Sequence, residues 1–176
     1  MKPTFVRLIT KFAPPEGAAS RRLRGVASTP LVDRQNEVVV PAGAQFTLPV
    51  PLLWSHRHAE PLGVVDGIEV RADGLHITAL LGNSSKANEA LELINMGGLS
   101  YSIGFMPLES VPMPGGGLKH TRYELVEISL VAVPAGRGTR ATRRLNAPDG
   151  SVKLLSHTFQ PGIPLLTTLE KPHEHR

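Results

Sequence analysis

Three polar side chains stand inside apolar, strand-like runs of this sequence and together could carry out nucleophilic chemistry. His56 ends the run 52–56, Ser102 lies in the run 100–105, and Glu127 lies in the run 124–131. A serine hydroxyl is a weak nucleophile near neutral pH, so it needs an adjacent general base. That base works best when a third group fixes its tautomer. An imidazole, a hydroxyl and a carboxylate are the parts of such a set.

Glu127 is the polar residue that strand geometry constrains most. Side chains alternate between the two faces of a strand, which groups Val126, Ile128 and Leu130 on one face. The opposite face then carries Leu125, Glu127, Ser129 and Val131. Both faces are mostly apolar, so the carboxylate needs a partner to offset its burial. A surface arginine and a histidine ring nitrogen both remain open as that partner.

Ser102 is surrounded by small residues that leave room for a substrate backbone. Gly97-Gly98 precede it and Gly104 follows it. Ser100 points the same way along the strand, so there are two candidate nucleophiles, and both are also compatible with ordinary strand serines. The Gly-x-Ser-x-Gly elbow is absent because Ser100 occupies its first glycine position, which disfavours an α/β-hydrolase.

A metal site is the alternative use of His56. His56 and His58 form a His-x-His pair, and His76 or His120 would have to supply a third ligand. The chain has no cysteine and no His-Glu-x-x-His motif, so the usual zinc patterns are missing. We therefore expect no metal and no cofactor.

Composition and periodicity predict a mostly β domain with one prominent helix. The 176 residues are 41% hydrophobic, with 17 glycines and 16 prolines, and no apolar run approaches the roughly 20 residues of a membrane span. We therefore expect a soluble cytoplasmic protein that does not bind membranes. Strands are predicted over 5–9, 23–27, 38–40, 52–54, 63–65, 68–70, 75–80, 99–105 and 120–133, with turns at Asp66-Gly67 and Asp73-Gly74.

The predicted helix has clear ends. Candidate N-caps at 83–85 precede the apolar series Ala87, Ala90, Leu91 and Ile94, and Gly97-Gly98 closes it. A second, short basic helix is predicted over 139–145. The fold class is α+β: a small closed β-barrel with one prominent helix before the Ser102 strand.

The order of the motifs along the chain is specific as a set. It begins with 25–28, Asp33 and 37–44, continues with 52–56 and Pro61-Leu62-Gly63, then Asp73-Gly74-Leu75, 98–105, 127–131 and Pro134-Ala135. In this order the chain resembles the phage prohead maturation proteases, the serine proteases of HK97-like tailed phages and prophages, over about residues 20–140. Where that family usually has asparagine after the Pro-Ala pair, this chain has Gly136.

The resemblance implies a fold similar to the herpesvirus assembly proteases, with His56 as general base, Ser102 as nucleophile and Glu127 as third member. We expect a protease domain over 1–145. The low charge and the prolines of the segment after it indicate an extension over 146–176 that is flexible or removed by processing. The implied substrate is a scaffold protein or the scaffold segment of the major capsid protein, and also the protease itself. The implied place is the assembling procapsid in the bacterial cytoplasm, and the implied state is a homo-oligomer such as a dimer. The loop at Gly136 is the candidate source of oxyanion donors.

Two non-enzymatic alternatives stay open at this point. One is a protease-fold protein that binds capsid or scaffold without cleaving it. The other is a basic nucleic-acid-binding domain, suggested by the net charge of +4 and by the arginines at 137, 140, 143 and 144. No aromatic residues interleave with these arginines, and we expect no specific nucleic acid partner.

Overall fold

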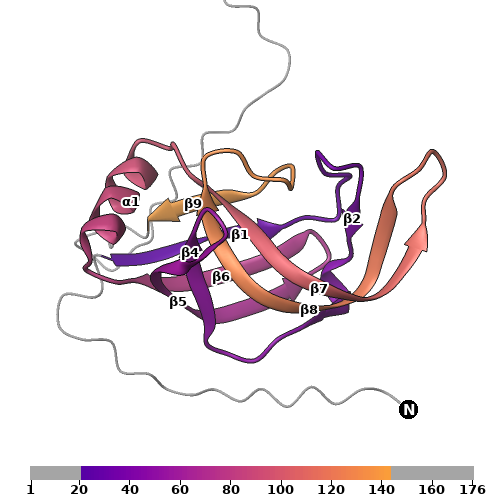
Figure 1. Cartoon of the computed structure of the whole chain (residues 1–176), viewed down its shortest axis with the longest axis horizontal. Helices are drawn as coiled ribbons and strands as arrows, with labels where there is room; N and C mark the ends of the chain where they lie inside the picture. Colours follow the sequence, from indigo (N-terminus) through magenta and orange to yellow (C-terminus); the bar gives the residue numbers. More distant parts are fainter. Residues whose placement is uncertain (1–20, 144–176) are drawn as a thin grey trace, which may run out of the picture.

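The computed structural model describes residues 21–143, so the strand expected at 5–9 and the extension expected at 146–176 lie outside the described residues. Nine strands and one α-helix make up this part (Figure 1). The elements are β1 (Arg22–Ser28), β2 (Val38–Val39), a 3₁₀ turn (Pro41–Gly43), β3 (Ala44–Gln45), β4 (Val50–Trp54), β5 (Arg57–Arg71), β6 (Gly74–Leu81), α1 (Ser85–Asn95), β7 (Ser100–Pro112), β8 (Leu118–Val131) and β9 (Arg140–Arg143).

All nine strands belong to one sheet, in which β8 pairs with more strands than any other. The order is β2-β8-β4-β5-β6-β1-β9, and β3 and β7 also pair with β8. β7 and β8 form a long antiparallel hairpin whose tip projects from the body of the molecule (Figure 1). β4 runs parallel to β8, with Leu53 opposite Ser129. This parallel pairing brings chain segments about 75 residues apart side by side.

The mostly β prediction with one helix is confirmed, but the prediction of a closed barrel is wrong. Within residues 21–143 no ladder joins β7 to β9, so the sheet stays open. β9 has only four residues and pairs only with β1 in this part of the chain. Helix α1 instead contributes Ala87, Ala90 and Ile94 to the core that the sheet surrounds, together with Tyr101 and Ile128. The helix therefore covers core that further strand pairing would cover in a barrel.

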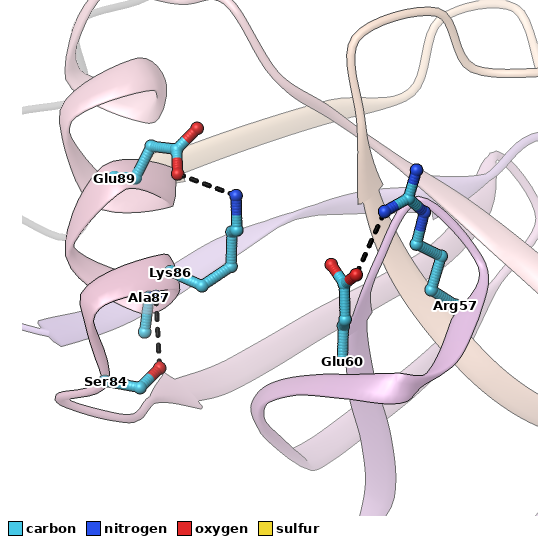
Figure 2. A network of polar contacts seen from close by, with 6 residues as sticks. All are labelled: Arg57, Glu60, Ser84, Lys86, Ala87 and Glu89. Carbon is cyan, nitrogen blue, oxygen red and sulfur yellow. Dashed lines mark hydrogen bonds and ion pairs between the residues drawn. The ribbon is translucent and has the colours of Figure 1, made fainter.

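Helix α1 has the ends that its sequence predicts. The Ser84 hydroxyl caps it by accepting from Ala87 N–H, and Lys86 pairs with Glu89 on its exposed side (Figure 2). At the other end Gly97 has φ 75°, and the amides of Gly97 and Gly98 bond back to the carbonyls of Ile94 and Leu93. This is the Schellman arrangement, which needs a left-handed residue at the glycine.

Two predictions made from short sequence patterns are wrong for the same reason: pairing with a neighbouring strand sets the backbone conformation there. Asp66-Gly67 is not a turn: β5 continues through it as one strand with an irregularity between Val65 and Gly67. The segment predicted as a basic helix over 139–145 contains β9 as far as it is described, where Ala141 is buried and pairs with Gly25. No helix between residues 21 and 143 is long and apolar enough to cross a membrane.

Candidate active site

His56 and Ser102 line one cavity of about 130 Å³. Its walls come from the segment after β1, from the β4–β5 turn, from the start of β7 and from the loop after β8. The lining residues are Ala27, Ser28, Thr29, Leu31, Asp33, Gln35, Glu37, Val39, His56, Ser102, Ile103, Phe105, Ala135 and Gly136. The cavity thus joins two of the three predicted site residues with the loop at Gly136.

His56 is held at a tight turn between two paired strands. Trp54 pairs with Arg57 across the turn, and Ser55 and His56 have φ of 50° and 60°. Two positive φ values in a two-residue hairpin are the pattern of a type I′ turn, which favours glycine and asparagine. The left-handed region costs other residues roughly 1–2 kcal/mol each. Ser55 N–H offsets part of this cost by donating to Leu130 O at 3.0 Å on the parallel neighbour β8.

The Glu127 carboxylate has two hydrogen-bond partners in the site. His56 Nδ1 lies 2.6 Å from Oε1, and the Ser129 hydroxyl donates to Oε2 at 2.7 Å. The Glu127 side chain is 4% exposed and that of His56 is 43% exposed. Because a carboxylate accepts hydrogen bonds, the contact places a proton on Nδ1 and leaves the Nε2 lone pair for a substrate or a hydroxyl.

Ser129 hydrogen-bonds to both His56 and Glu127, although the sequence analysis assigns it no role. Its hydroxyl donates to Glu127 and also accepts from the His56 backbone N–H at 2.9 Å. It therefore links the turn that carries the imidazole to the strand that carries the carboxylate. The signal for it was present, because strand alternation places Ser129 on the same face as Glu127, two residues away.

The β7–β8 ladder places Ser102 beside this network. Ser102 pairs with Ser129, and Gly104 pairs with Glu127. Ser102 is 5% exposed and opens into the cavity, whereas Ser100 is not among the cavity residues. Within residues 21–143 no hydrogen bond joins the Ser102 hydroxyl to His56. Such bonds often form or tighten only once substrate is bound.

The space around Glu127 depends on Gly104. A methyl group at Gly104 would lie 2.1 Å from Glu127 Oε1, much closer than real contacts allow. The two faces of β8 differ in burial at this point. Val126 is 41% exposed while Leu125 and Glu127 are buried, which is the alternation expected of a strand.

The remaining histidines of the metal alternative lie in separate surroundings. His58 is exposed, His76 contacts Asp73 on an exposed hairpin, and His120 is buried between Ser110 and Glu37. Among residues 21–143 no group of three metal-ligating side chains is close enough to hold an ion.

The profile of the caudovirus prohead serine protease family matches residues 26–149, which include His56, Ser102 and Glu127. The chain belongs to this family. A capsid polyprotein of Pseudomonas phage PAJU2 is 39% identical over 124 residues, which are 65% of this chain and 19% of that relative. The chain therefore spans about a fifth of the length of the polyprotein.

Two solved structures of a herpesvirus protease are also similar. One is the KSHV protease in complex with a hexapeptide phosphonate inhibitor, with a TM-score of 0.46 and 16% identity over 68% of this chain and 63% of that chain. The other is the Kaposi's sarcoma-associated herpesvirus protease with an allosteric inhibitor. Its TM-score is 0.39, with 15% identity over 69% of this chain and 74% of that chain.

Proposed function

We propose that this prohead protease family member is a serine endopeptidase with Ser102 as nucleophile, His56 as general base and Glu127 as the residue that orients the base. The observation that carries the proposal is the 2.6 Å contact between His56 Nδ1 and Glu127 Oε1 at the cavity that Ser102 also lines. Glu127 holds the ring tautomer in which Nε2 is free to take a proton.

The proposed reaction is acyl transfer in two stages. Ser102 Oγ bonds to the scissile carbonyl carbon while its proton moves to His56 Nε2, and the carbonyl oxygen becomes an oxyanion. The carbon–nitrogen bond then breaks as His56 gives the proton to the leaving amine. Water, deprotonated by His56, releases the acyl group and restores Ser102. Amide N–H groups of the loop at Gly136, which lines the cavity, are the proposed oxyanion donors.

The proposed substrate is the scaffold protein, or the scaffold segment of the major capsid protein, cleaved inside the procapsid in the bacterial cytoplasm. Family membership and the capsid polyprotein relative support this assignment. Self-cleavage near the end of a protease domain over 1–145, and assembly as a homo-oligomer, belong to the same proposal. No metal or cofactor takes part in the proposed steps.

The test is co-expression with the major capsid protein of the same phage, read by intact mass. Ser102→Ala is expected to abolish cleavage, and His56→Ala to behave alike. Ser100→Ala is the matched control, because Ser100 sits on the same strand outside the cavity and its loss is expected to leave cleavage unchanged. Glu127→Gln is expected to lower the cleavage rate by up to about 10⁴-fold. Equal cleavage by wild type and Ser102→Ala would refute the assignment.

A further inference from the structure

Successive carbonyl groups of the loop after β8 each accept a hydrogen bond, and Arg34 supplies most of the donors. Arg34 Nη1 donates to Pro134 O at 2.8 Å and to Gly136 O at 3.4 Å. Arg34 N–H donates to Ala135 O at 3.1 Å. Arg34 alone therefore binds three consecutive carbonyls of the segment that borders the cavity.

Two threonines extend the same pattern. The Thr29 hydroxyl donates to Arg137 O at 2.6 Å, and the Thr139 hydroxyl donates to Gly136 O at 3.4 Å. Each carbonyl from 134 to 137 thus has a donor. The amides of Ala135, Gly136 and Arg137 have no hydrogen-bond acceptor within the described residues.

Peptide geometry gives this pattern a direction. In a trans peptide unit the N–H points opposite to the C=O that precedes it. Carbonyls drawn toward Arg34 therefore turn the following N–H groups away from Arg34. Ala135 and Gly136 line the cavity that holds Ser102, and Arg34 is not among the lining residues. The carbonyl side of the loop is bound, and the N–H groups on its other side have no acceptor among residues 21–143.

The backbone on both sides of Arg34 is fixed by hydrogen bonds of Asp33. The carboxylate of Asp33 accepts hydrogen bonds from the backbone N–H groups of Gln35 and Glu37, at 2.8 and 2.9 Å. The Asp33 N–H donates to Glu37 O. This fixes the backbone from which the arginine reaches the loop. A guanidinium also polarises the peptide groups it binds, which strengthens their N–H groups as donors.

We propose that Arg34 is a positioning residue that orients the 134–137 loop so that its amide N–H groups face the oxyanion formed at Ser102. The inference rests on the proposed function, since it needs an oxyanion to stabilise. Arg34 acts only through the loop and does not touch the reacting atoms. Removing one preorganised donor of this kind lowers the rate by about 10²–10³-fold. Loss of the residue that aims them is expected to cost about tenfold or more.

The test is labelling of the purified chain by a fluorophosphonate, whose phosphoryl oxygen occupies the place of the oxyanion. Arg34→Ala is expected to lower the maximal labelling rate about tenfold or more while the half-saturating probe concentration stays the same. Added guanidinium chloride, far below denaturing levels, is expected to restore part of the rate. Arg122→Ala, which removes an exposed arginine paired with Glu109 on the β7–β8 hairpin, is the control and is expected to label normally.

The outcomes separate the two proposals. An unchanged labelling rate in Arg34→Ala overturns the positioning role. A lower labelling rate that added guanidinium fails to restore also overturns it, because an arginine that only stabilises the fold gives that result. Should Arg34→Ala not fold, Arg34→Gln keeps most of the volume without the charge. A wild-type rate in Arg34→Gln overturns the role, and a rate about tenfold lower supports it. Labelling that is the same in wild type and Ser102→Ala overturns the proposed function together with this inference.

Discussion

Gly104→Ala is a small change that should separate His56 from Glu127, the proposed base and its orienting residue, without replacing either side chain. The added methyl group would lie 2.1 Å from Glu127 Oε1 and 2.8 Å from Cδ. To reach even 3.0 Å, the oxygen must retreat by about 0.9 Å. That same oxygen holds His56 Nδ1 at 2.6 Å, so the contact lengthens to a distance at which a hydrogen bond is weak.

The expected loss follows from this displacement. A 1 Å misplacement in a catalytic set costs about 10²-fold, and forcing a methyl group into a packed site costs roughly 1–3 kcal/mol of folding free energy. We expect fluorophosphonate labelling of Ser102 to slow by about 10²-fold and the melting temperature to fall. The assay is the labelling time course, measured at a temperature where thermal unfolding shows the variant fully folded.

The matched control is Gly67→Ala, where the added methyl group would lie 2.5 Å from Thr78 Oγ1 on the β5–β6 ladder. It imposes comparable crowding outside the cavity, so stability is expected to fall while labelling stays near the wild-type rate. If folded Gly104→Ala labels as fast as wild type, the reasoning that ties catalysis to the position of Glu127 is refuted.

Three further substitutions test other contacts. Ser129→Ala removes the hydroxyl that joins His56 N–H to Glu127, so labelling is expected to slow about tenfold and the free energy of unfolding to fall by about 1–3 kcal/mol, read by urea titration. Ser84→Ala removes the α1 cap and is expected to cost about 1 kcal/mol with labelling unchanged. Tyr101→Phe deletes a buried hydroxyl without a hydrogen-bond partner among residues 21–143. It is expected to leave the melting temperature equal or higher, and a clear drop would contradict this.

Local signals in the sequence were sufficient where local chemistry decides the structure. The Ser84 cap, the apolar spacing of α1 and the Gly97-Gly98 ending all predict the helix as it is found. The turn predicted at Asp73-Gly74 is likewise local; it lies one residue earlier, at Ala72-Asp73, and Arg71 pairs with Gly74 across it. Burial of Glu127 followed from alternation along an apolar run, without knowledge of its neighbours.

Elsewhere, strand pairing between distant segments overrides the local sequence patterns, and predictions made from those patterns are wrong. Asp66-Gly67 has turn composition, yet the residues on either side pair continuously with β6, and Gly67 sits at the irregularity that this pairing accommodates. Ala141 is buried because β9 pairs with β1, which nothing in its own segment indicates. The positive φ of His56 and the reach of Arg34 to the 134–137 loop also depend on segments far away in the chain.

The parallel pairing of β4 with β8 has a consequence for the timing of activity. His56 and Glu127 are 71 residues apart, and the turn that carries the imidazole is bonded to Ser129 and Leu130 at the end of β8. A nascent chain that has emerged only through β7 already contains the histidine and the serine, but it has neither the carboxylate nor the strand that seats the turn. Under the proposed function, a chain that ends before β8 therefore lacks the groups that orient His56, and cleavage requires synthesis to have passed Ser129.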